Sequence, residues 1–308
     1  MNISIVLPLY NKAPFVKETL QSVFDQTKLP FELVIVDDKS TDGSLQIARD
    51  FLYSNNTFTR NVRVEIVELE ENGGVSVARN VGFEKTTGDT VVFLDGDDLY
   101  ANDLLEVSND LMINYSMDFL IIGIHLFPSN TFLPDLGKLN QKLIPIFDDV
   151  YRIEEPLKAV SSMHFYMGLG SNVIAKRKWM ESIQFYEKRN FYEGIDYWYK
   201  VLKRVLRKRD NSIGLLMGNR IKVREVAGSA SRKKFGAWYE IAEAPLLNSC
   251  KGSENRYDKL MMGVVGKRWL RYSIKNLKTV KQKIIFIYKY KHLFKNQLYY
   301  FFLRTMNR

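Results

Sequence analysis

The sequence has few residues of the kinds that build disulfides, transition-metal sites or membrane spans. Among 308 residues Cys250 is the single cysteine, which excludes an internal disulfide and a cysteine-rich metal site. The three histidines, His125, His164 and His292, are isolated and show no ligand spacing. No apolar run approaches the roughly 20 residues of a membrane-spanning helix. The first residues also lack the pattern of a signal peptide, so we expect a cytoplasmic protein.

Acidic residues are absent from the last part of the chain. No Asp or Glu follows Asp258, whereas residues 259–308 hold 13 of the 45 Lys and Arg residues. The other 32 basic residues face 35 acidic ones, although the whole chain has a formal net charge of +10. The positive charge therefore belongs to the C-terminal region, and we expect no nucleic-acid partner.

Three carboxylates follow the short apolar run at residues 90–94. The run is β-branched and aromatic, which predicts a buried strand. Asp95, Asp97 and Asp98 then stand at its C-terminal end, where ligands bind in open α/β sheets. Like charges this close need compensation, and Mg²⁺ or Mn²⁺ is often held by one or two carboxylates and phosphate oxygens. The alternative is an acidic turn that caps the following helix.

The first hundred residues alternate between predicted strands and helices, which is typical of a mainly parallel sheet. Three of the four strands end in polar residues, at Tyr10, at Asp37–Asp38 and at the carboxylates above. Such a rim suits a nucleotide: Asp37 or Asp38 can accept from a base or ribose, and Arg79 can meet a diphosphate. Alternatively, the two aspartates lead into a capped turn and Arg79 is a solvated helix residue.

Four ordered motifs in this region resemble family 2 glycosyltransferases of the GT-A fold. They are Val-Leu-Pro-Leu-Tyr-Asn-Lys, Ile-Val-Asp-Asp-Lys-Ser-Thr-Asp-Gly-Ser, Asn-Gly-Gly-Val-Ser-Val-Ala-Arg-Asn-Val-Gly and Phe-Leu-Asp-Gly-Asp-Asp. The resemblance implies an α/β, Rossmann-like fold with a mainly parallel sheet flanked by helices. It also implies a nucleoside-diphosphate sugar donor, usually a uridine one, and transfer with inversion.

The same resemblance assigns site residues. Pro8, Tyr10 and Asp38 would line the nucleoside pocket with Asp37 beside them, and Arg79 would contact the nucleotide. Asp95 and Asp97 form the DxD pattern, with Asp95 also near the nucleotide. Asp98 is an equally good direct ligand for Mn²⁺ or Mg²⁺.

The expected base region departs from the family pattern. The family normally reads Glu-Asp-x-Asp or Glu there, and the Asp of the Glu-Asp pair is the usual base, but this chain has Gly194 at that position. Glu193 and Asp196 lie about one helical turn apart, so either can serve, and we favour Asp196 slightly. The alternative is a weak or inactive transferase. The aromatic residues 197–199 either stack on a sugar or belong to the core.

A late segment resembles the family loop that closes over the diphosphate, usually Arg-x-His-x-x-Ser-x-Ser. Arg224, Ser229 and Ser231 match this pattern, whereas Val226 occupies the histidine position. A solvated basic loop is the alternative. Earlier in the chain, residues 128–145 are expected to form a lid, a substrate loop or a disordered stretch. Residues 167–175 are expected to form a strand beside the donor site.

We predict a catalytic domain over residues 1–240 and a helical, basic region over residues 241–308. The nucleotide-binding half covers about residues 1–115 and the acceptor half about residues 116–240. Apolar, aromatic helix faces with basic flanks suit an anionic membrane surface. The alternative is a helical bundle on the catalytic domain or on a second subunit of a homodimer.

The resemblance thus implies an inverting bacterial glycosyltransferase, which we expect in the cytoplasm or at the inner face of the cell membrane. It would act on a glycan or lipid-linked glycan in capsule, exopolysaccharide or lipopolysaccharide synthesis. One alternative is a nucleotide-sugar-binding module without efficient catalysis, which Gly194 and Val226 permit. Another is a nucleotidyltransferase, but residues 8–14 lack the glycine-rich loop that such enzymes have after the first strand.

Overall fold

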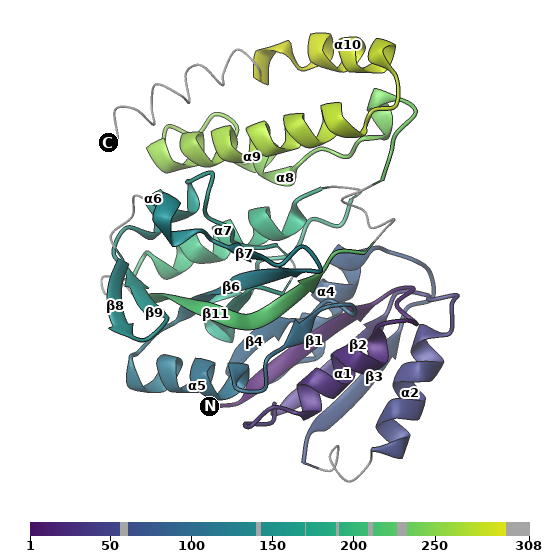
Figure 1. The fold of residues 1–308 in the computed structure, drawn as a ribbon, viewed down its shortest axis with the longest axis vertical. Coiled ribbons are helices and arrows are strands. Elements are labelled where there is room, and N and C mark those ends of the chain that lie inside the picture. The colour runs from purple at the N-terminus through teal and green to yellow at the C-terminus, as the bar shows by residue number, and fades with distance from the viewer. Residues whose placement is uncertain are drawn as a thin grey trace.

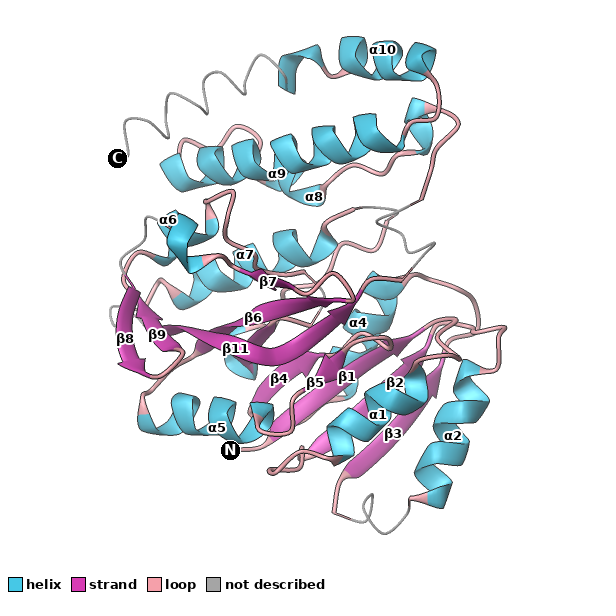
Figure 2. Ribbon diagram, in the orientation of Figure 1, coloured by secondary structure: helices cyan, strands magenta, loops and turns pink. Residues whose placement is uncertain are grey.

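The computed structural model describes residues 1–55, 61–139, 143–169, 171–188, 191–208, 212–226 and 233–293. In this part of the chain an 11-stranded sheet has the order β3-β2-β1-β4-β10-β6-β11-β9-β8, with β5 on β11 and β7 on β6 (Figures 1 and 2). The strands are β1 (Ile3–Leu9), β2 (Glu32–Asp37), β3 (Arg63–Glu68), β4 (Thr90–Phe93), β5 (Leu99–Tyr100), β6 (Phe119–Phe127), β7 (Thr131–Leu133), β8 (Leu143–Phe147), β9 (Val150–Ile153), β10 (Val173–Lys176) and β11 (Ile213–Arg224).

The first four strands are parallel, as predicted. In register, β1 pairs with β2 from Ser4 opposite Glu32 to Leu9 opposite Asp37, and β4 and β3 continue the parallel set on either side. Parallel strands place their carboxyl ends at one edge of a sheet. The polar residues that follow β1, β2 and β4 therefore share that edge.

The second half of the sheet is mixed. Strand β10 runs antiparallel between β4 and β6 and contains the last three residues of the strand expected over residues 167–175. Strand β11 runs parallel to β6. The described part of residues 128–145, expected to be a lid, a substrate loop or disordered, adds strands to the sheet. It contributes β7, which pairs with β6, and β8, which pairs with β9.

Helices cover both faces of the sheet (Figures 1 and 2). They are α1 (Val16–Phe24), α2 (Ser44–Ser54), α4 (Val75–Lys85), α5 (Leu104–Asn114), α6 (Pro156–Val160), α7 (Glu193–Val205), α8 (Pro245–Ser249), α9 (Arg256–Asn276) and α10 (Val280–Lys289). Alternate residues of β1 point to opposite faces, so Ile5 and Leu7 join the core under α1, α2 and α5, whereas Val6 joins the core on the other face. The predicted α/β architecture, with a mainly parallel first half, is confirmed.

The C-terminal helices share a core with the sheet. Trp269 of α9 and Phe286 of α10 belong to the same buried cluster as Val6 and Phe93. The core is thus continuous across residue 240. The predicted domain boundary near that residue stays a prediction. None of the described helices is both long and apolar enough to cross a bilayer.

Residues 197–199 on α7 belong to the core rather than to a sugar-binding surface. Tyr197, Trp198 and Tyr199 are each at most 2% exposed. Rings of Tyr197 and Trp198 lie edge-on to Phe93 of β4, at 6.2 and 5.9 Å between centroids. They therefore fix α7 against the sheet.

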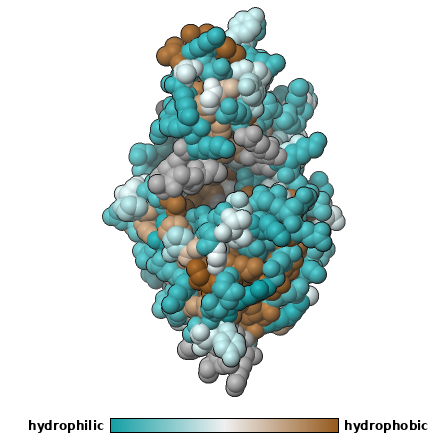
Figure 3. Space-filling view, turned by 90° about the vertical axis from the view of Figure 1, so that its right-hand side faces the viewer, coloured by the Kyte–Doolittle hydropathy of each residue, from teal (hydrophilic) through white to brown (hydrophobic). Residues whose placement is uncertain are grey.

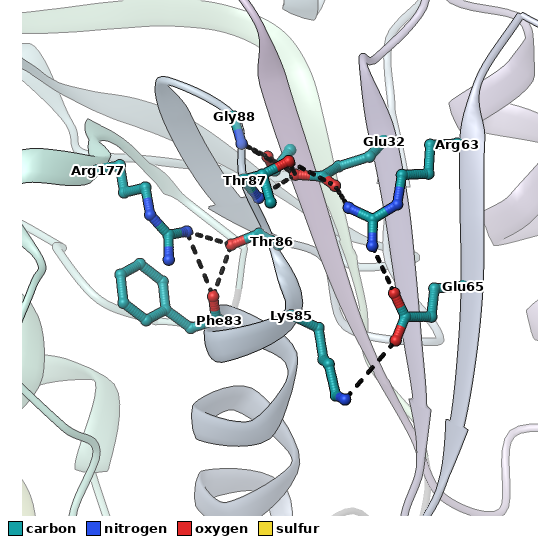
Figure 4. Close-up of polar contacts among 10 residues, drawn as sticks. Glu32, Arg63, Glu65, Phe83, Lys85, Thr86, Thr87, Gly88 and Arg177 are labelled. Carbon is teal, nitrogen blue, oxygen red and sulfur yellow. Dashed lines mark hydrogen bonds and ion pairs between the residues drawn. The ribbon is translucent and has the colours of Figure 1, made fainter.

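At the opposite edge of the sheet, where the parallel strands begin, the buried carboxylate of Glu32 connects several elements (Figure 4). Glu32 accepts hydrogen bonds from Ser4 Oγ at 2.6 Å and from the backbone amides of Thr87 and Gly88. Arg63 pairs with it at 2.6 Å. Burial by itself raises the pKa of Glu32, but these donors and Arg63 outweigh it and lower that pKa below its ordinary 4.5. Glu32 thus joins β1, β2, β3 and the turn before β4.

We predict that Glu32→Gln lowers the free energy of unfolding by about 1.5–3 kcal/mol at neutral pH, because an amide cannot accept all of these hydrogen bonds. A group with a lowered native pKa stabilises the fold above its unfolded pKa and loses this effect as the pH falls. The difference between wild type and variant should therefore shrink below about pH 4.5. Urea unfolding at several pH values tests this. The control is Glu65→Gln, which removes the more exposed partner of Arg63 and should cost about 0–1 kcal/mol.

Candidate functional site

Two loops at the C-terminal edge of the sheet are tied together by hydrogen bonds. The Asp38 amide donates to the Leu9 carbonyl at 2.8 Å, and the Lys12 amide donates to Ser44 Oγ at 2.6 Å. Tyr10, in the first of these loops, is 45% exposed, whereas Pro8 is buried within β1. Figure 3 looks from the right-hand side of Figure 1, toward which β1 and β2 point, and shows this side hollowed between its upper and lower parts.

Asp37 and Asp38 are both buried but differ in their partners. The Asp38 carboxylate accepts from the Gly73 amide at 2.7 Å and the Gly74 amide at 2.9 Å. Burial raises the pKa of Asp38, and the two amides offset this only in part. Asp37 accepts from the Ser40 amide through Oδ2, whereas its buried Oδ1 has no hydrogen-bond partner among the described residues. Asp38 therefore shapes the loop at Gly73 and Gly74, and Asp37 is enclosed beside it.

Arg79 projects from α4 into the same edge. Its guanidinium donates to Asp95 Oδ1 at 2.7 Å and to Glu193 Oε1 at 2.9 Å, and it lies over the Phe185 ring at 5.3 Å. Burial would lower the pKa of Arg79, but the two carboxylates outweigh it and raise that pKa, so the group stays charged. Its Nε is also buried without a partner among the described residues. The close approach of α4 to the sheet depends on Gly82, where a Cβ would lie 2.3 Å from Val6 Cγ1.

The three carboxylates after β4, here called the acidic cluster (Asp95, Asp97 and Asp98), have different partners. Asp95 pairs with Arg79, and Asp97 pairs with Lys12. Asp98 accepts from Ser171 Oγ at 3.0 Å and from the Arg224 amide at 3.2 Å. The structure thus brings the three predicted metal ligands to one turn. It adds Lys12 and Ser171, neither of which the sequence singled out.

The acidic cluster carries more negative charge than its partners neutralise. Burial raises the pKa of Asp97, and Lys12 offsets this only in part. Burial, together with the charges of Asp95 and Asp97, raises the pKa of Asp98 well above its usual range. In the described part of the chain no three acidic, His or Cys side chains converge as a metal cage. One or two of these carboxylates plus diphosphate oxygens still match the usual ligand set of Mg²⁺, so the residues fit a cation that arrives with its substrate.

Arg224 at the end of β11 closes one side of the acidic cluster. Its Nε donates to the Asp97 carbonyl at 3.1 Å, and its guanidinium pairs with Glu18. The guanidinium lies between the rings of Phe15 and Phe127, at 4.9 and 4.7 Å. Arg224, the first residue of the late segment that matches the family pattern, is therefore next to the carboxylates. Ser229 and Ser231 lie outside the described residues.

The two candidate bases lie in different surroundings although both are on the first turn of α7. Glu193 pairs with Arg79 and so contacts the network that contains Asp95, and its side chain is 21% exposed. Asp196 is 2% exposed, and its oxygens accept from Lys200 Nζ at 2.6 Å and from Ser249 Oγ at 2.5 Å. Only Glu193, of the two, is linked to the acidic cluster by contacts among the described residues.

Gly194 lies directly against the backbone of Gly168. A Cβ at Gly194 would be 2.3 Å from the Gly168 carbonyl oxygen, and a Cβ at Gly168 would be 2.5 Å from the Gly194 oxygen. Gly168 also has a φ of +75°, which side chains rarely adopt. Here the segment before β10 touches the start of α7, so a side chain at position 194 has no space.

Comparison with known proteins identifies relatives of the N-terminal half. The family model "Glycosyl transferase family 2" matches residues 4–183. The "Putative teichuronic acid biosynthesis glycosyltransferase TuaG" of Bacillus subtilis (strain 168) is 39% identical over 124 residues, which are 40% of this chain and 47% of that protein. An uncharacterized glycosyltransferase of Haemophilus influenzae is 38% identical over 111 residues, which are 36% of this chain and 42% of that protein. The chain thus spans less than half the length of these curated relatives.

Solved structures of TarS from Staphylococcus aureus share the fold. The structure of TarS residues 1–349 in complex with UDP-GlcNAc has a TM-score of 0.61 at 16% identity, covering 96% of this chain and 89% of that one. The structure of the same TarS segment described without a ligand has a TM-score of 0.62 at 20% identity, covering 90% and 74%. The likeness extends over nearly all of this chain, including its second half.

We predict that Gly194→Ala lowers the free energy of unfolding by about 1–3 kcal/mol, because the methyl group would overlap the Gly168 carbonyl. Thermal or urea unfolding measures this. The matched control is Gly43→Ala, since a Cβ there meets nothing within 4 Å and only its φ of +87° opposes the change. A Gly194→Ala protein as stable as wild type would contradict the close contact.

Proposed function

Because its match to the family model covers more than half of its residues, the chain belongs to glycosyl transferase family 2, and we propose that it transfers a sugar from a nucleoside diphosphate to a hydroxyl group. One observation carries this proposal. The loop that holds the exposed Tyr10 contacts the acidic cluster through Lys12, and Arg79 pairs with Asp95 of the same cluster. That edge brings an aromatic ring, a guanidinium and carboxylates together.

The donor in this proposal is a uridine diphosphate sugar. Asp37 lies beside the nucleoside, which Tyr10, exposed in the adjoining loop, covers. Arg79 supplies positive charge beside the diphosphate while Asp95 holds the guanidinium in place. The choice of uridine is supported by the TarS structures in complex with UDP and with UDP-GlcNAc, which share this fold.

A divalent cation is part of the proposal. Asp97 and Asp98, with Asp95 beside them, are the residues that would hold Mn²⁺ or Mg²⁺. When bound, such an ion neutralises the charge of the leaving diphosphate. The position of these carboxylates in one turn at the C-terminal edge supports the cation, because a diphosphate bound at that edge could supply the remaining oxygen ligands.

Glu193 is the base in the proposed transfer. It accepts the proton of the acceptor hydroxyl as that oxygen bonds to the anomeric carbon, and the bond from this carbon to the diphosphate breaks with its electron pair on the leaving oxygen. A single displacement of this kind inverts the anomeric configuration. Partial exposure makes Glu193 reachable, whereas both oxygens of Asp196 are already engaged.

The acceptor in this proposal is a hydroxyl of a bacterial surface polymer or of its lipid-linked precursor. Support comes from the printed functions of the relatives, which include teichuronic acid biosynthesis and, for TarS, transfer of N-acetylglucosamine to poly(ribitol-phosphate). The donor sugar of this chain can be found by measuring UDP release from a panel of UDP-sugars.

We predict that UDP binds in a manganese-dependent way, and that Asp97→Asn weakens this binding about tenfold or more. Isothermal calorimetry with UDP, with and without Mn²⁺, measures both quantities. Asp25→Asn serves as the control, because Asp25 lies at the exposed end of α1 and contacts Gln21. Equal UDP affinity with and without Mn²⁺ would contradict the cation, and absence of UDP binding would contradict the donor site.

We also predict that Glu193→Gln lowers the turnover of UDP-sugar about 10²- to 10⁴-fold while UDP affinity changes little, because the amide cannot accept a proton. Asp196→Asn should reduce stability more than turnover, since it breaks a buried pair with Lys200. Rates are compared below the melting temperature of each variant. If Asp196→Asn instead abolishes turnover in a folded protein, Asp196 is the base. UDP binding without any turnover would indicate a binding module.

A further inference from the structure

One face of α10 presents apolar side chains to solvent. Val280, Ile284, Ile287 and Tyr288, here called the outer face of α10, are 70, 62, 41 and 71% exposed. Their spacing of four, seven and eight residues from the first places them on one side of the helix. In Figure 1 α10 lies at the end of the molecule beyond α9, and Figure 3 shows hydrophobic side chains gathered at that end.

The other side of α10 packs against the rest of the described chain. Phe286 is buried with its ring 5.3 Å from that of Trp269, and Tyr290 lies 4.8 Å from the same ring. The Trp238 amide donates to Gln282 Oε1 at 3.1 Å. These contacts attach α10 to the rest of the chain, so the outer face adds nothing to the described core. An exposed apolar face of this kind is a mark of an interaction surface.

The charged side chains of α10 itself are all basic. At 3.6 residues per turn, Lys281 and Lys283 border the apolar stripe on its two sides. Lys291, just past the helix, is exposed, whereas Lys289 lies on the opposite side, over the Trp238 ring. Glu243 accepts from Tyr290 beyond the end of the stripe. No acidic residue occurs anywhere after Asp258 in the sequence. The partner must therefore accept apolar side chains in its interior and carry negative charge at its surface.

We propose that the outer face of α10 inserts into the surface of an anionic lipid bilayer. Apolar side chains of such a helix enter the boundary between headgroups and acyl chains, and the flanking lysines contact the lipid phosphates. The helix lies in the plane of the membrane, and the C-terminal end of the molecule faces the lipid. This inference does not depend on the reaction that the protein catalyses.

A second copy of the chain fits this face less well. A symmetric dimer through α10 would bring the same lysines of both subunits together, and like charges across an interface are unfavourable. An anionic bilayer instead pairs every lysine with an opposite charge. We therefore assign the outer face of α10 to a lipid surface. Self-association is an outcome that the experiment below can also detect.

The test is sedimentation of the full chain with vesicles of phosphatidylcholine alone or with 30% phosphatidylglycerol, a lipid composition chosen as about that of an anionic bacterial surface. We expect wild type to sediment with the anionic vesicles, less so at high salt, and poorly with the neutral ones. The double variant Ile284→Glu and Ile287→Glu should lower the partition coefficient about tenfold or more. Ile113→Glu, at a 51% exposed isoleucine of α5, is the matched control and should bind as wild type does.

Several results would overturn the proposal. One is that wild type does not bind anionic vesicles, and another is that it binds neutral vesicles equally well. A third is that the double variant binds as wild type does. A concentration-dependent dimer in sedimentation velocity that disappears in the double variant would assign the face to a second copy. Circular dichroism and melting curves verify that both variants are folded. UDP binding, measured in parallel, should be the same in all three proteins, which separates this test from that of the donor site.

Discussion

The structure at the C-terminal edge of the sheet depends on how the charge of closely spaced carboxylates is balanced. Arg79 and Lys12 neutralise two members of the acidic cluster, while Asp98 relies on a hydroxyl and a backbone amide. The balance is incomplete, as the raised pKa values of Asp97 and Asp98 indicate. Elements from every part of the chain meet there because each contributes a donor: the loop after β1, α4, the segment before β10 and the end of β11.

Buried carboxylates at the two edges of the parallel strands differ in their hydrogen-bond donors and in the direction of their pKa shifts. At the N-terminal edge, Glu32 receives hydrogen bonds from three residues and an ion pair from Arg63, and its pKa is lowered. At the C-terminal edge, Asp98 has fewer donors and two acidic neighbours, and its pKa is raised. The same sheet thus has one edge where a buried carboxylate is well supplied with donors and one where a buried carboxylate has fewer donors and acidic neighbours.

Much of this arrangement could be predicted from the sequence because it depends on local patterns. Short apolar runs followed by polar residues were sufficient to place Asp38 and Asp95 along one edge, and the family resemblance assigned Arg79 to the nucleotide there. The roles of Lys12 and Ser171 could not be predicted, because each contacts the acidic cluster across more than 70 residues of sequence. The difference between Glu193 and Asp196 was also hidden, since it depends on Ser249 in α8, which folds back onto α7.

The contact between Gly168 and Gly194 has a consequence for how this sequence can change over time. If ancestors of this chain carried the acidic residue that is usual in the family at position 194, its return by one mutation is now blocked, because the carbonyl of Gly168 fills the space for any Cβ. The segment before β10 would have to withdraw first, and that movement would disturb Ser171 and its contacts with the acidic cluster. Under that condition the substitution is entrenched, because an acidic side chain could return at position 194 only together with a change in the Gly168 segment.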